Sequence, residues 1–122
     1  MILLDTNALI WLDRGHRRAR TLAGSGRRLY ISPATLLELQ FLMEAGRIRL
    51  RESSISQLAH GGGWLLDDPP ATTWFETALD VGWTRDPFDR LIVAHARCRH
   101  WKLATGDSRL LERLSAGECL AI

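Results

Sequence analysis

The chain begins with an apolar stretch that leads directly into an acid, and this stretch constrains the fold more than any other. Ile2, Leu3 and Leu4 are three bulky apolar residues in succession, which is typical of a short strand buried on both faces of a parallel sheet. Asp5 follows this strand and precedes an apolar, helix-like run over residues 8–12. Because open α/β sheets bind ligands at the carboxyl ends of their strands, we expect Asp5 to lie at the functional edge of such a sheet.

Strand-like and helix-like segments alternate along the rest of the chain. Further strands are predicted at residues 29–31, 64–67, 102–105 and 119–122, and helices at residues 6–13, 33–45, 54–60, 73–81, 87–100 and 109–114. Alternation without hairpin signals predicts a parallel sheet with helices on both faces. The expected fold is therefore a doubly wound, three-layer α/β/α sandwich with a central parallel β-sheet, formed by a single domain over residues 1–122.

The basic residues are almost all arginine, and several of them cluster after the first predicted helix. Lys102 is the only lysine in the sequence, and the cluster contains Arg14, Arg17, Arg18 and Arg20. Arginine pairs with phosphate in a bidentate fork and stacks on bases, so this usage suits a nucleic-acid partner. An arginine-favouring genome explains it equally well. The cluster is thus a candidate RNA-binding surface, with a solvated charged face as the alternative.

Several sequence features bear on the compartment, and together they favour a soluble cytoplasmic protein. Cys98 and Cys119 match no C-x-x-C or zinc pattern, so we expect two reduced, buried thiols. Asp5 interrupts the apolar N-terminal stretch and no basic residue precedes it, which argues against a signal peptide. The longest uncharged run is too short to span a bilayer, so no membrane association is expected. The tryptophans are expected mostly to pack the core.

Four acids stand out as candidates for chemistry: Asp5, Glu38, Asp89 and Asp107. Asp5 and Asp107 each follow a strand and precede a helix, where an aspartate often serves only as the helix N-cap. Glu38 caps nothing, because it lies in the middle of a helix that is apolar nearly all round. A charge among leucines is costly unless a cation or hydrogen-bond donors meet it. Glu38 is therefore the acid that most clearly indicates a site.

Two acids compete for the start of the helix at 87–100. Asp86 precedes Pro87 and suits the N-cap position. Asp89 is then the third helical residue, where it can complete the cap or point into a cleft. We assign Asp86 to the cap and Asp89 to the site.

If the four acids meet at the carboxyl edge of the sheet, they need a countercharge, since neighbouring carboxylates repel one another. All-oxygen ligation suits Mg²⁺ or Mn²⁺, and the sequence has no Cys/His cluster that would favour zinc. A cation held in this way can activate a water molecule and stabilise a phosphoryl transition state, while arginines hold the phosphate backbone. The acids thus predict metal-dependent hydrolysis of a phosphodiester.

Four motifs of this chain resemble those of the PIN-domain nucleases. They are Asp5-Thr6-Asn7, the mid-helix Glu38, the string D-P-F-D-R-L-I-V-A-H-A that begins at Asp86, and L-A-T-G-D ending at Asp107. The string from Asp86 is the most specific, and it resembles the VapC-type toxins of bacterial toxin–antitoxin pairs over nearly the whole chain. The resemblance implies a five-stranded parallel sandwich and Mg²⁺/Mn²⁺-dependent endoribonuclease activity. It also implies a homodimer that is inhibited by a cognate VapB-type antitoxin, whose tail occupies the active-site groove.

The resemblance also implies a set of site residues. The acidic quartet of the family maps onto Asp5, Glu38, Asp89 and Asp107, with Thr6, Asn7, Asp86 and Thr105 as supporting residues. Two features depart from the family pattern. Residues 61–84 match no motif, and Gly106 stands directly before Asp107, where a side chain is more usual and where glycine could loosen the turn.

Other functions fit the sequence less well. A haloacid-dehalogenase-like phosphatase needs a second aspartate where this chain has Asn7. A response-regulator receiver needs a lysine at the end of a late strand, whereas Lys102 begins its strand. The remaining alternative is a catalytically silent PIN-like domain that binds RNA or a protein partner, and retention of all four acids argues against it.

The predicted helix at 33–45 carries a further expectation. This helix has almost no polar face, because many of its residues are large and apolar: Leu36, Leu37, Leu39, Phe41, Leu42 and Met43. Because a helix of this kind is normally buried, we expect part of it to lie in an interface with another subunit or with the antitoxin.

Overall fold

Five parallel strands form one sheet in the computed structural model, which describes residues 1–24, 26–51 and 54–122. The strands are β1 (Ile2–Leu4), β2 (Leu29–Ile31), β3 (Trp64–Leu66), β4 (Lys102–Thr105) and β5 (Cys119–Ala121), in the order β3-β2-β1-β4-β5. Every pairing between neighbours is parallel. The α/β sandwich predicted from the alternation of apolar segments is confirmed, and the strand positions agree with the prediction to within one residue.

The helices also follow the predicted order. They are α1 (Thr6–Asp13), α2 (Pro33–Glu44), α3 (Ile55–His60), α4 (Ala71–Leu79), α5 (Pro87–Arg99) and α6 (Ser108–Arg113). Two differences from the sequence prediction stand out. Helix α4 begins two residues earlier than predicted, after the Pro69-Pro70 break, and a short 3-10 helix, η1 (Arg17–Ala19), forms within the basic cluster.

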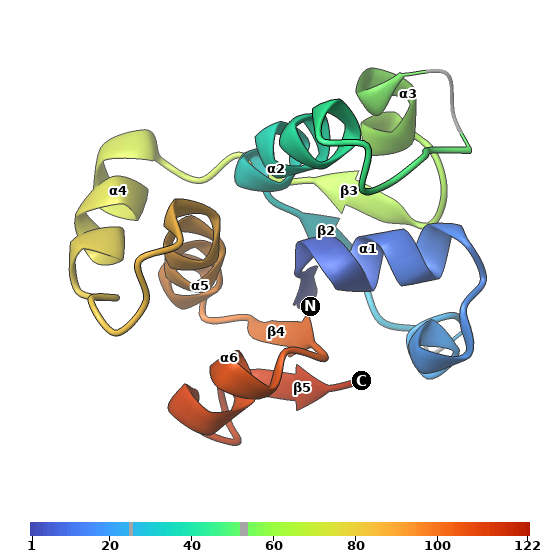
Figure 1. The fold of residues 1–122 in the computed structure, drawn as a ribbon. Helices are drawn as coiled ribbons and strands as arrows, with labels where there is room; N and C mark the ends of the chain where they lie inside the picture. The colour runs from blue at the N-terminus through green and yellow to red at the C-terminus, as the bar shows by residue number, and fades with distance from the viewer. Residues whose placement is uncertain (25, 52–53) are drawn as a thin grey trace.

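Helices cover both faces of the sheet, as Figure 1 shows. Ile2 and Leu4 of β1 pack in one apolar cluster with residues of α1, α2 and α3. Leu3, which points to the opposite face, packs in a second cluster with residues of α4, α5 and α6. All three side chains are buried, and full burial of each stabilises the fold by about 1.5–3 kcal/mol. The opening strand is thus buried on both faces, as its sequence predicts.

The strand order reverses between β1 and β4, and this reversal decides where a ligand site can form. The chain leaves β1 toward β2 and β3 on one side, and it later returns to β4 and β5 on the other. Helices that leave neighbouring strands in opposite directions open a crevice at the carboxyl edge, where doubly wound sheets bind ligands. Leu4 pairs with Ala104 in the sheet, so Asp5 and the residues after Thr105 meet at this point.

A buried polar contact ties α5 to the end of β3. His95, fully buried on α5, lies with its Nε2 2.7 Å from Oδ2 of Asp67. The same carboxylate accepts two hydrogen bonds from the Arg99 guanidinium, at 2.8 and 3.1 Å. Because Arg99 and His95 are one helical turn apart, Asp67 fixes the rotation of α5 against the sheet.

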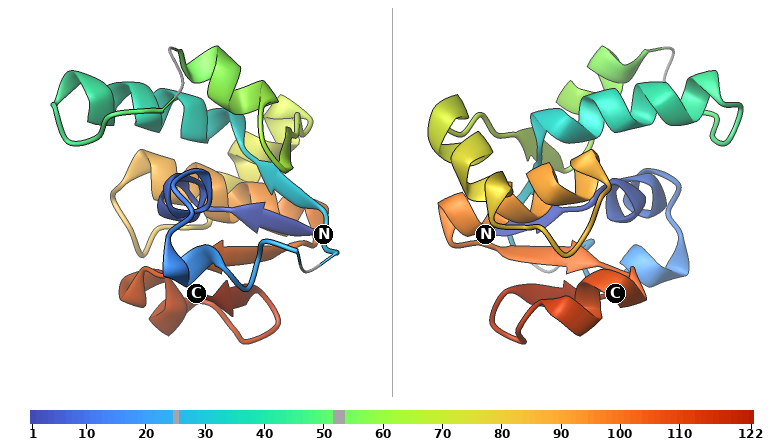
Figure 2. Two further views of the ribbon diagram at one scale, coloured as in Figure 1. Left: turned by 90° about the vertical axis from the view of Figure 1, so that its right-hand side faces the viewer. Right: turned by 60° about the vertical axis from the view of Figure 1, so that its left-hand side comes forward.

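Residues 47–51, in which arginines alternate with apolar residues, form a loop. It lies against the end of α1, where Arg14 Nη2 donates to the Arg49 carbonyl at 3.0 Å and Arg51 Nη1 donates to the Asp13 carbonyl at 3.1 Å. The 3-10 helix η1 lies near the C-terminal end of β5, where the light-blue segment approaches the red strand in both views of Figure 2. The basic residues thus form part of the surface around the carboxyl edge of the sheet.

One expectation about core residues needs correction, and a second, that the tryptophans mostly pack the core, is confirmed, because Trp83 and Trp101 pack against the second apolar cluster in addition to the two buried tryptophans. Cys98 and Cys119 are free thiols, as predicted, but both are half-buried instead of fully buried, because they lie at the rim of the second apolar cluster. Of the tryptophans, Trp64 and Trp74 are buried and the other three are half-buried. No helix in the described residues has the length and apolar character that crossing a membrane requires.

Candidate active site

A cleft of about 380 Å³ opens at the carboxyl edge of the sheet, where the strand order reverses. Its walls come from α1, α2, α5, α6 and the loop after α2. The polar residues that line it are Asp5, Thr6, Asn7, Glu38, Arg47, Asp86, Asp89, Asp107 and Arg109. Five carboxyl groups and two guanidinium groups therefore face one small volume. All four acids that the sequence singles out are among them.

Asp5 lies at the base of the cleft. Its carboxylate accepts a hydrogen bond from the backbone N–H of Ala8 at 2.7 Å, so it caps α1. It also accepts a hydrogen bond from the buried Thr105 hydroxyl. The capping role and the cleft position are thus compatible, because a carboxylate has enough lone pairs to accept from a helix N-terminus and still face a ligand.

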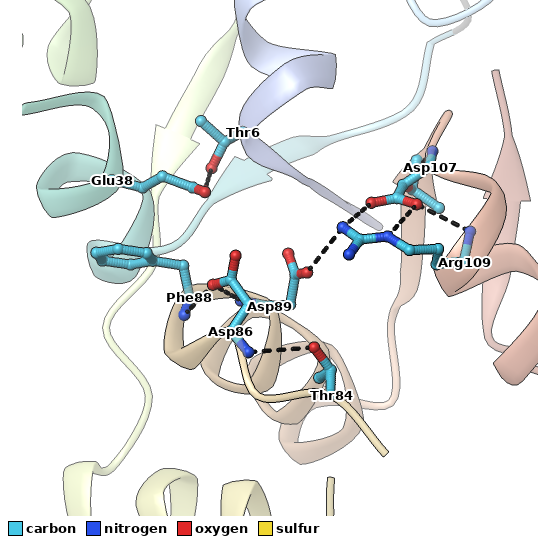
Figure 3. Close-up of polar contacts among 9 residues, drawn as sticks. Thr6, Glu38, Thr84, Asp86, Phe88, Asp89, Asp107 and Arg109 are labelled. Carbon is cyan, nitrogen blue, oxygen red and sulfur yellow. Dashed lines mark hydrogen bonds and ion pairs between the residues drawn. The ribbon is translucent and has the colours of Figure 1, made fainter. Parts of the chain in front are cut away.

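Glu38 points from the middle of α2 toward α1. Its carboxylate accepts a hydrogen bond from the hydroxyl of Thr6, as Figure 3 shows. The side chain is half-buried, and the donor it requires is supplied by the residue next to Asp5. This contact explains how a charged group is tolerated on an otherwise apolar helix.

At the start of α5, Asp86 caps the helix, as the sequence predicts, and Asp89 lies in the first turn. Asp86 is the N-cap, and its Oδ1 accepts from the backbone N–H groups of Phe88 at 2.8 Å and of Asp89 at 3.2 Å. The side chain of Asp89 points across the cleft toward α6, where its Oδ2 lies 3.7 Å from Nη2 of Arg109 (Figure 3). Both residues line the cleft, so Asp86 adds negative charge to it in addition to capping the helix.

Asp107 caps α6 and is held by an arginine two residues later. Its carboxylate accepts from the backbone N–H of Arg109 at 2.8 Å and from the Arg109 guanidinium at 3.0 Å. The Thr105 hydroxyl accepts from the backbone N–H of Asp107 at 3.0 Å. Thr105 therefore connects Asp5 with Asp107, which is the supporting position that the motif implies.

Gly106 fits a close contact in the turn before Asp107. A Cβ at this position would lie 2.8 Å from the ring of Trp11 and 2.6 Å from the guanidinium of Arg18, which itself stacks on Trp11 at 4.2 Å. The glycine is therefore required by packing against α1 and η1. It does not loosen the turn, because the neighbouring acid is held in place by Thr105 and Arg109.

The acids of the cleft are hard to ionise together. Burial raises the pKa of Asp5 to about 6, with smaller contributions from the charges of Glu38 and Asp107. Burial, together with the charges of Asp86, Glu38 and Asp107, raises the pKa of Asp89 to about 7. Burial and the charge of Asp86 raise the pKa of Glu38, although its bond from Thr6 lowers it. These three acids therefore lack sufficient positive charge around them.

Asp107 is the exception. The hydrogen bond from the Arg109 side chain holds its pKa below the usual value. Arg109 thus compensates the acid at one end of the cleft, while Asp5, Glu38 and Asp89 remain undercompensated.

The donor chemistry of the cleft suits a hard divalent cation. Carboxylate oxygens with a neighbouring hydroxyl and amide are the ligands that Mg²⁺ and Mn²⁺ prefer, and a cation would relieve the repulsion that raises these pKa values. As the side chains lie, no three His, Cys, Asp or Glu groups within residues 1–24, 26–51 and 54–122 are arranged to hold an ion. Glu38 is turned to Thr6 and Asp107 to Arg109, so some of these contacts must rearrange before several acids can share one cation.

The basic cluster predicted to contact RNA lies outside the cleft. Arg14, Arg17, Arg18 and Arg20 are exposed, and none of them belongs to its lining. The arginines that do line it are Arg47 and Arg109. The local signal for Arg109 is its place in the first turn of α6, two residues after Asp107, whereas Arg47 follows Gly46 in a loop that has no motif of its own.

The comparisons with known proteins agree with this architecture. The family model of the PIN domain matches residues 2–116. A chain of a structure described as a toxin-antitoxin complex from Klebsiella pneumoniae is similar over 99% of this chain and 97% of that one, with 18% identity and a TM-score of 0.70. No curated protein matches the sequence.

Two further solved structures have similar chains. One is described as VapBC2 from Rickettsia felis bound to a DNA fragment from their promoter, with 18% identity, 92% coverage of each chain and a TM-score of 0.62. The other is FitAcB from Neisseria gonorrhoeae, with 26% identity, 88% coverage of each chain and a TM-score of 0.53.

Proposed function

Because the chain belongs to the PIN-domain family, we propose that it is a metal-dependent endoribonuclease and the toxin of a VapBC-type toxin–antitoxin pair. PIN domains are generally nucleases that depend on divalent metal. The observation that carries the proposal is the meeting of five carboxyl groups in one cleft at the point where the strand order reverses.

Asp5, Glu38, Asp89 and Asp107 would hold Mg²⁺ or Mn²⁺ directly or through water. When bound, the cation supplies Lewis-acid activation of the attacking water and offsets the charge of the phosphodiester. Thr6 orients Glu38, Thr105 joins Asp5 to Asp107, and Asp86 fixes the start of α5 so that Asp89 faces the cleft. Asn7 lines the same wall and adds an amide to the donor set.

The RNA would approach over the arginines that surround the cleft. Arg47 lies in its lining, and Arg18 stacks on Trp11 next to Gly106, one residue from Asp107. From Arg18, the exposed Arg14, Arg17 and Arg20 extend the positive surface away from the cleft. Guanidinium groups in this arrangement can follow a phosphate backbone without reading its sequence.

A VapB-type antitoxin is the proposed partner, and a homodimer is the proposed assembly. The similar chains of known structure come from complexes whose descriptions name a toxin–antitoxin complex and VapBC2. Leu37 and Phe41 of α2 are more than half exposed, which supports an interface on that helix.

The test is cleavage of a mixed RNA pool by the purified chain with Mg²⁺ or Mn²⁺. We expect cleavage that EDTA abolishes and that added Mn²⁺ restores, and we expect Asp5→Asn to lose it. Cleavage that survives EDTA, or full activity of Asp5→Asn, would refute the assignment. A small antitoxin-like reading frame directly upstream would support the toxin role.

The second candidate function is a catalytically silent domain that binds RNA or a protein. It predicts binding that does not change with metal and no turnover under any of these conditions. The raised pKa values of Asp5 and Asp89 favour the enzyme, because a domain without need of a cation gains nothing from burying several acids together.

A further inference from the structure

Arg109 connects two acids that come from different parts of the fold. Its Nη2 lies 3.0 Å from Oδ2 of Asp107 and 3.7 Å from Oδ2 of Asp89. Asp107 follows β4 and Asp89 belongs to the first turn of α5, so the guanidinium bridges the two elements (Figure 3). It is the positive group that stands between these acids in the described part of the chain.

The arginine is much more exposed to solvent than the two acids with which it pairs. Its side chain is 73% exposed, whereas those of Asp89 and Asp107 are 16% and 23% exposed. Exposed ion pairs contribute little to stability, so moving Arg109 away costs little if another cation replaces it. A neighbouring cleft of about 230 Å³, lined by Trp83, Thr84 and Glu112 among others, also borders Arg109 and offers space for a second position.

The contacts of Asp5 and Glu38 also bear on which acids are free to bind a cation. Asp5 accepts from Ala8 and Thr105, and Glu38 accepts from Thr6. These bonds use neutral donors and leave further lone pairs available. The Asp107 carboxylate, by contrast, is held by a full positive charge, which a divalent cation would have to displace.

We infer that Arg109 is a resident counter-ion that competes with the divalent cation for Asp89 and Asp107, and that its side chain must leave these acids when the cation binds. This inference rests on the proposed metal dependence of the site. The released guanidinium stays at the edge of the cleft, where its planar fork suits a phosphate oxygen of the RNA. Arg109 is thus paired with the acids in the metal-free protein and with the substrate in the loaded one.

The test is the affinity for Mn²⁺, measured by calorimetry and by the loss of the free-Mn²⁺ electron paramagnetic resonance signal. Arg109→Gln should bind Mn²⁺ roughly fivefold more tightly than the unchanged protein, since two exposed ion pairs no longer compete. It should also bind a single-stranded RNA several-fold more weakly when Ca²⁺ replaces Mn²⁺ to prevent cleavage. Circular dichroism checks that the variant is folded.

Arg113→Gln is the matched control. It removes the same charge from the same helix, but the guanidinium of Arg113 lies 6.0 Å from the centre of the Trp83 ring, whereas that of Arg109 lies between Asp89 and Asp107. A Mn²⁺ affinity that rises equally in both variants would reduce the effect to general electrostatics and overturn the inference. An unchanged or weaker affinity of Arg109→Gln would overturn it as well.

The outcomes separate this inference from the proposed function. If the unchanged protein binds Mn²⁺ and cleaves RNA but Arg109→Gln has the same affinity, the function stands and the inference fails. If neither protein binds Mn²⁺, the metal-dependent function fails, and the inference fails with it.

Discussion

The hydroxyl of Thr6 donates a hydrogen bond to the carboxylate of Glu38 and thereby joins the first turn of α1 to the middle of α2. Thr35 Oγ1 lies 3.4 Å from Thr6 Oγ1, so Thr35 can donate to Thr6 while Thr6 donates to Glu38. Thr6 and Thr35 are buried, and the glutamate is half-buried. A chain of two hydroxyls therefore fixes the direction in which the α2 acid enters the cleft.

Replacing Thr6 with valine should disturb this arrangement. Without the donor, the pKa of Glu38 should rise further, because the Thr6 bond is what lowers it against burial. We expect Thr6→Val to lose about 1 kcal/mol of stability and several-fold in RNA cleavage at neutral pH, with activity partly recovered at higher pH. Thr6→Ser keeps the hydroxyl and should retain both. Urea unfolding and a pH–rate profile measure the two effects, and equal pH profiles for valine and serine would contradict the role of the bond.

Replacing Asp89 should reduce RNA cleavage more than replacing Asp86. Asp89→Asn removes a charge that faces the cleft and should reduce cleavage at least about 100-fold with little loss of stability. Asp86→Asn keeps a side-chain oxygen that can cap α5, so its activity should fall less. Cleavage rates of both variants at saturating Mn²⁺ provide the comparison. The reverse ranking would mean that the cap and the metal ligand have been exchanged.

The stability of the metal-free protein should depend on pH through Asp5. Its pKa of about 6 lies above the value of 3.8 expected for the unfolded chain, so the folded state holds the proton more strongly. This stabilisation is fully present below pH 3.8 and is lost as the pH rises through about 6. The full loss amounts to at most about 3 kcal/mol.

Asp5→Asn should remove this part of the pH dependence. Asparagine keeps an oxygen for the Ala8 N–H, so the helix cap survives. In EDTA, the variant should be more stable than the unchanged protein at pH 8 and similar to it near pH 4. Urea unfolding over this range gives both free energies, and parallel curves would contradict the pKa assignment.

A side chain at position 106 should disturb the packing of α1. Gly106→Ala places a methyl group 2.8 Å from the ring of Trp11, and overpacking of this kind costs about 1–3 kcal/mol. The double variant with Trp11→Ala should be less destabilised than the sum of the two single variants. Gly82→Ala is the control, because a Cβ at Gly82 meets nothing within 4 Å. Additive effects in thermal unfolding would show that the contact is not the cause.

The exposed apolar side chains of α2 should contribute to assembly. Leu37 and Phe41, 55% and 53% exposed, lie four residues apart on one face of the helix. Leu37→Ser combined with Phe41→Ser should convert a dimer to a monomer, or abolish binding of the neighbouring gene's product, as measured by light scattering. Gln40→Ser, at another exposed position of α2, should change neither. An intact dimer in the double variant would mean that the interface lies elsewhere, for example at the exposed Phe75 and Leu79 of α4.

The acids of the cleft could be identified from the sequence, because each is marked by its immediate neighbours in the chain. Each aspartate stands at the end of a strand or the start of a helix, and Glu38 stands out against the apolar helix around it. The alternation of elements predicts a parallel sheet, and a parallel sheet brings the carboxyl ends of its strands together at one edge. These features need no knowledge of contacts distant in the chain.

The arginines of the cleft and the need for Gly106 could not be predicted in this way. Arg109 reaches Asp89, which lies 20 positions earlier in the sequence, only because α6 and α5 meet at the same edge. Gly106 packs on Trp11, which lies in the first helix. The basic cluster was conspicuous in the sequence, yet the loop that carries Arg47 is what enters the cleft.

The position of β4 next to the central strand β1 has a consequence during synthesis of the protein. Asp5, Glu38 and Asp89 leave the ribosome before β4 and Asp107 do, and until then β1 lacks its neighbour on that side. A nascent chain, or one truncated before residue 107, holds three of the acids with neither the fourth nor the arginine that pairs with it. The cleft therefore gains its last acid, and the arginine that pairs with it, only when most of the chain has been made.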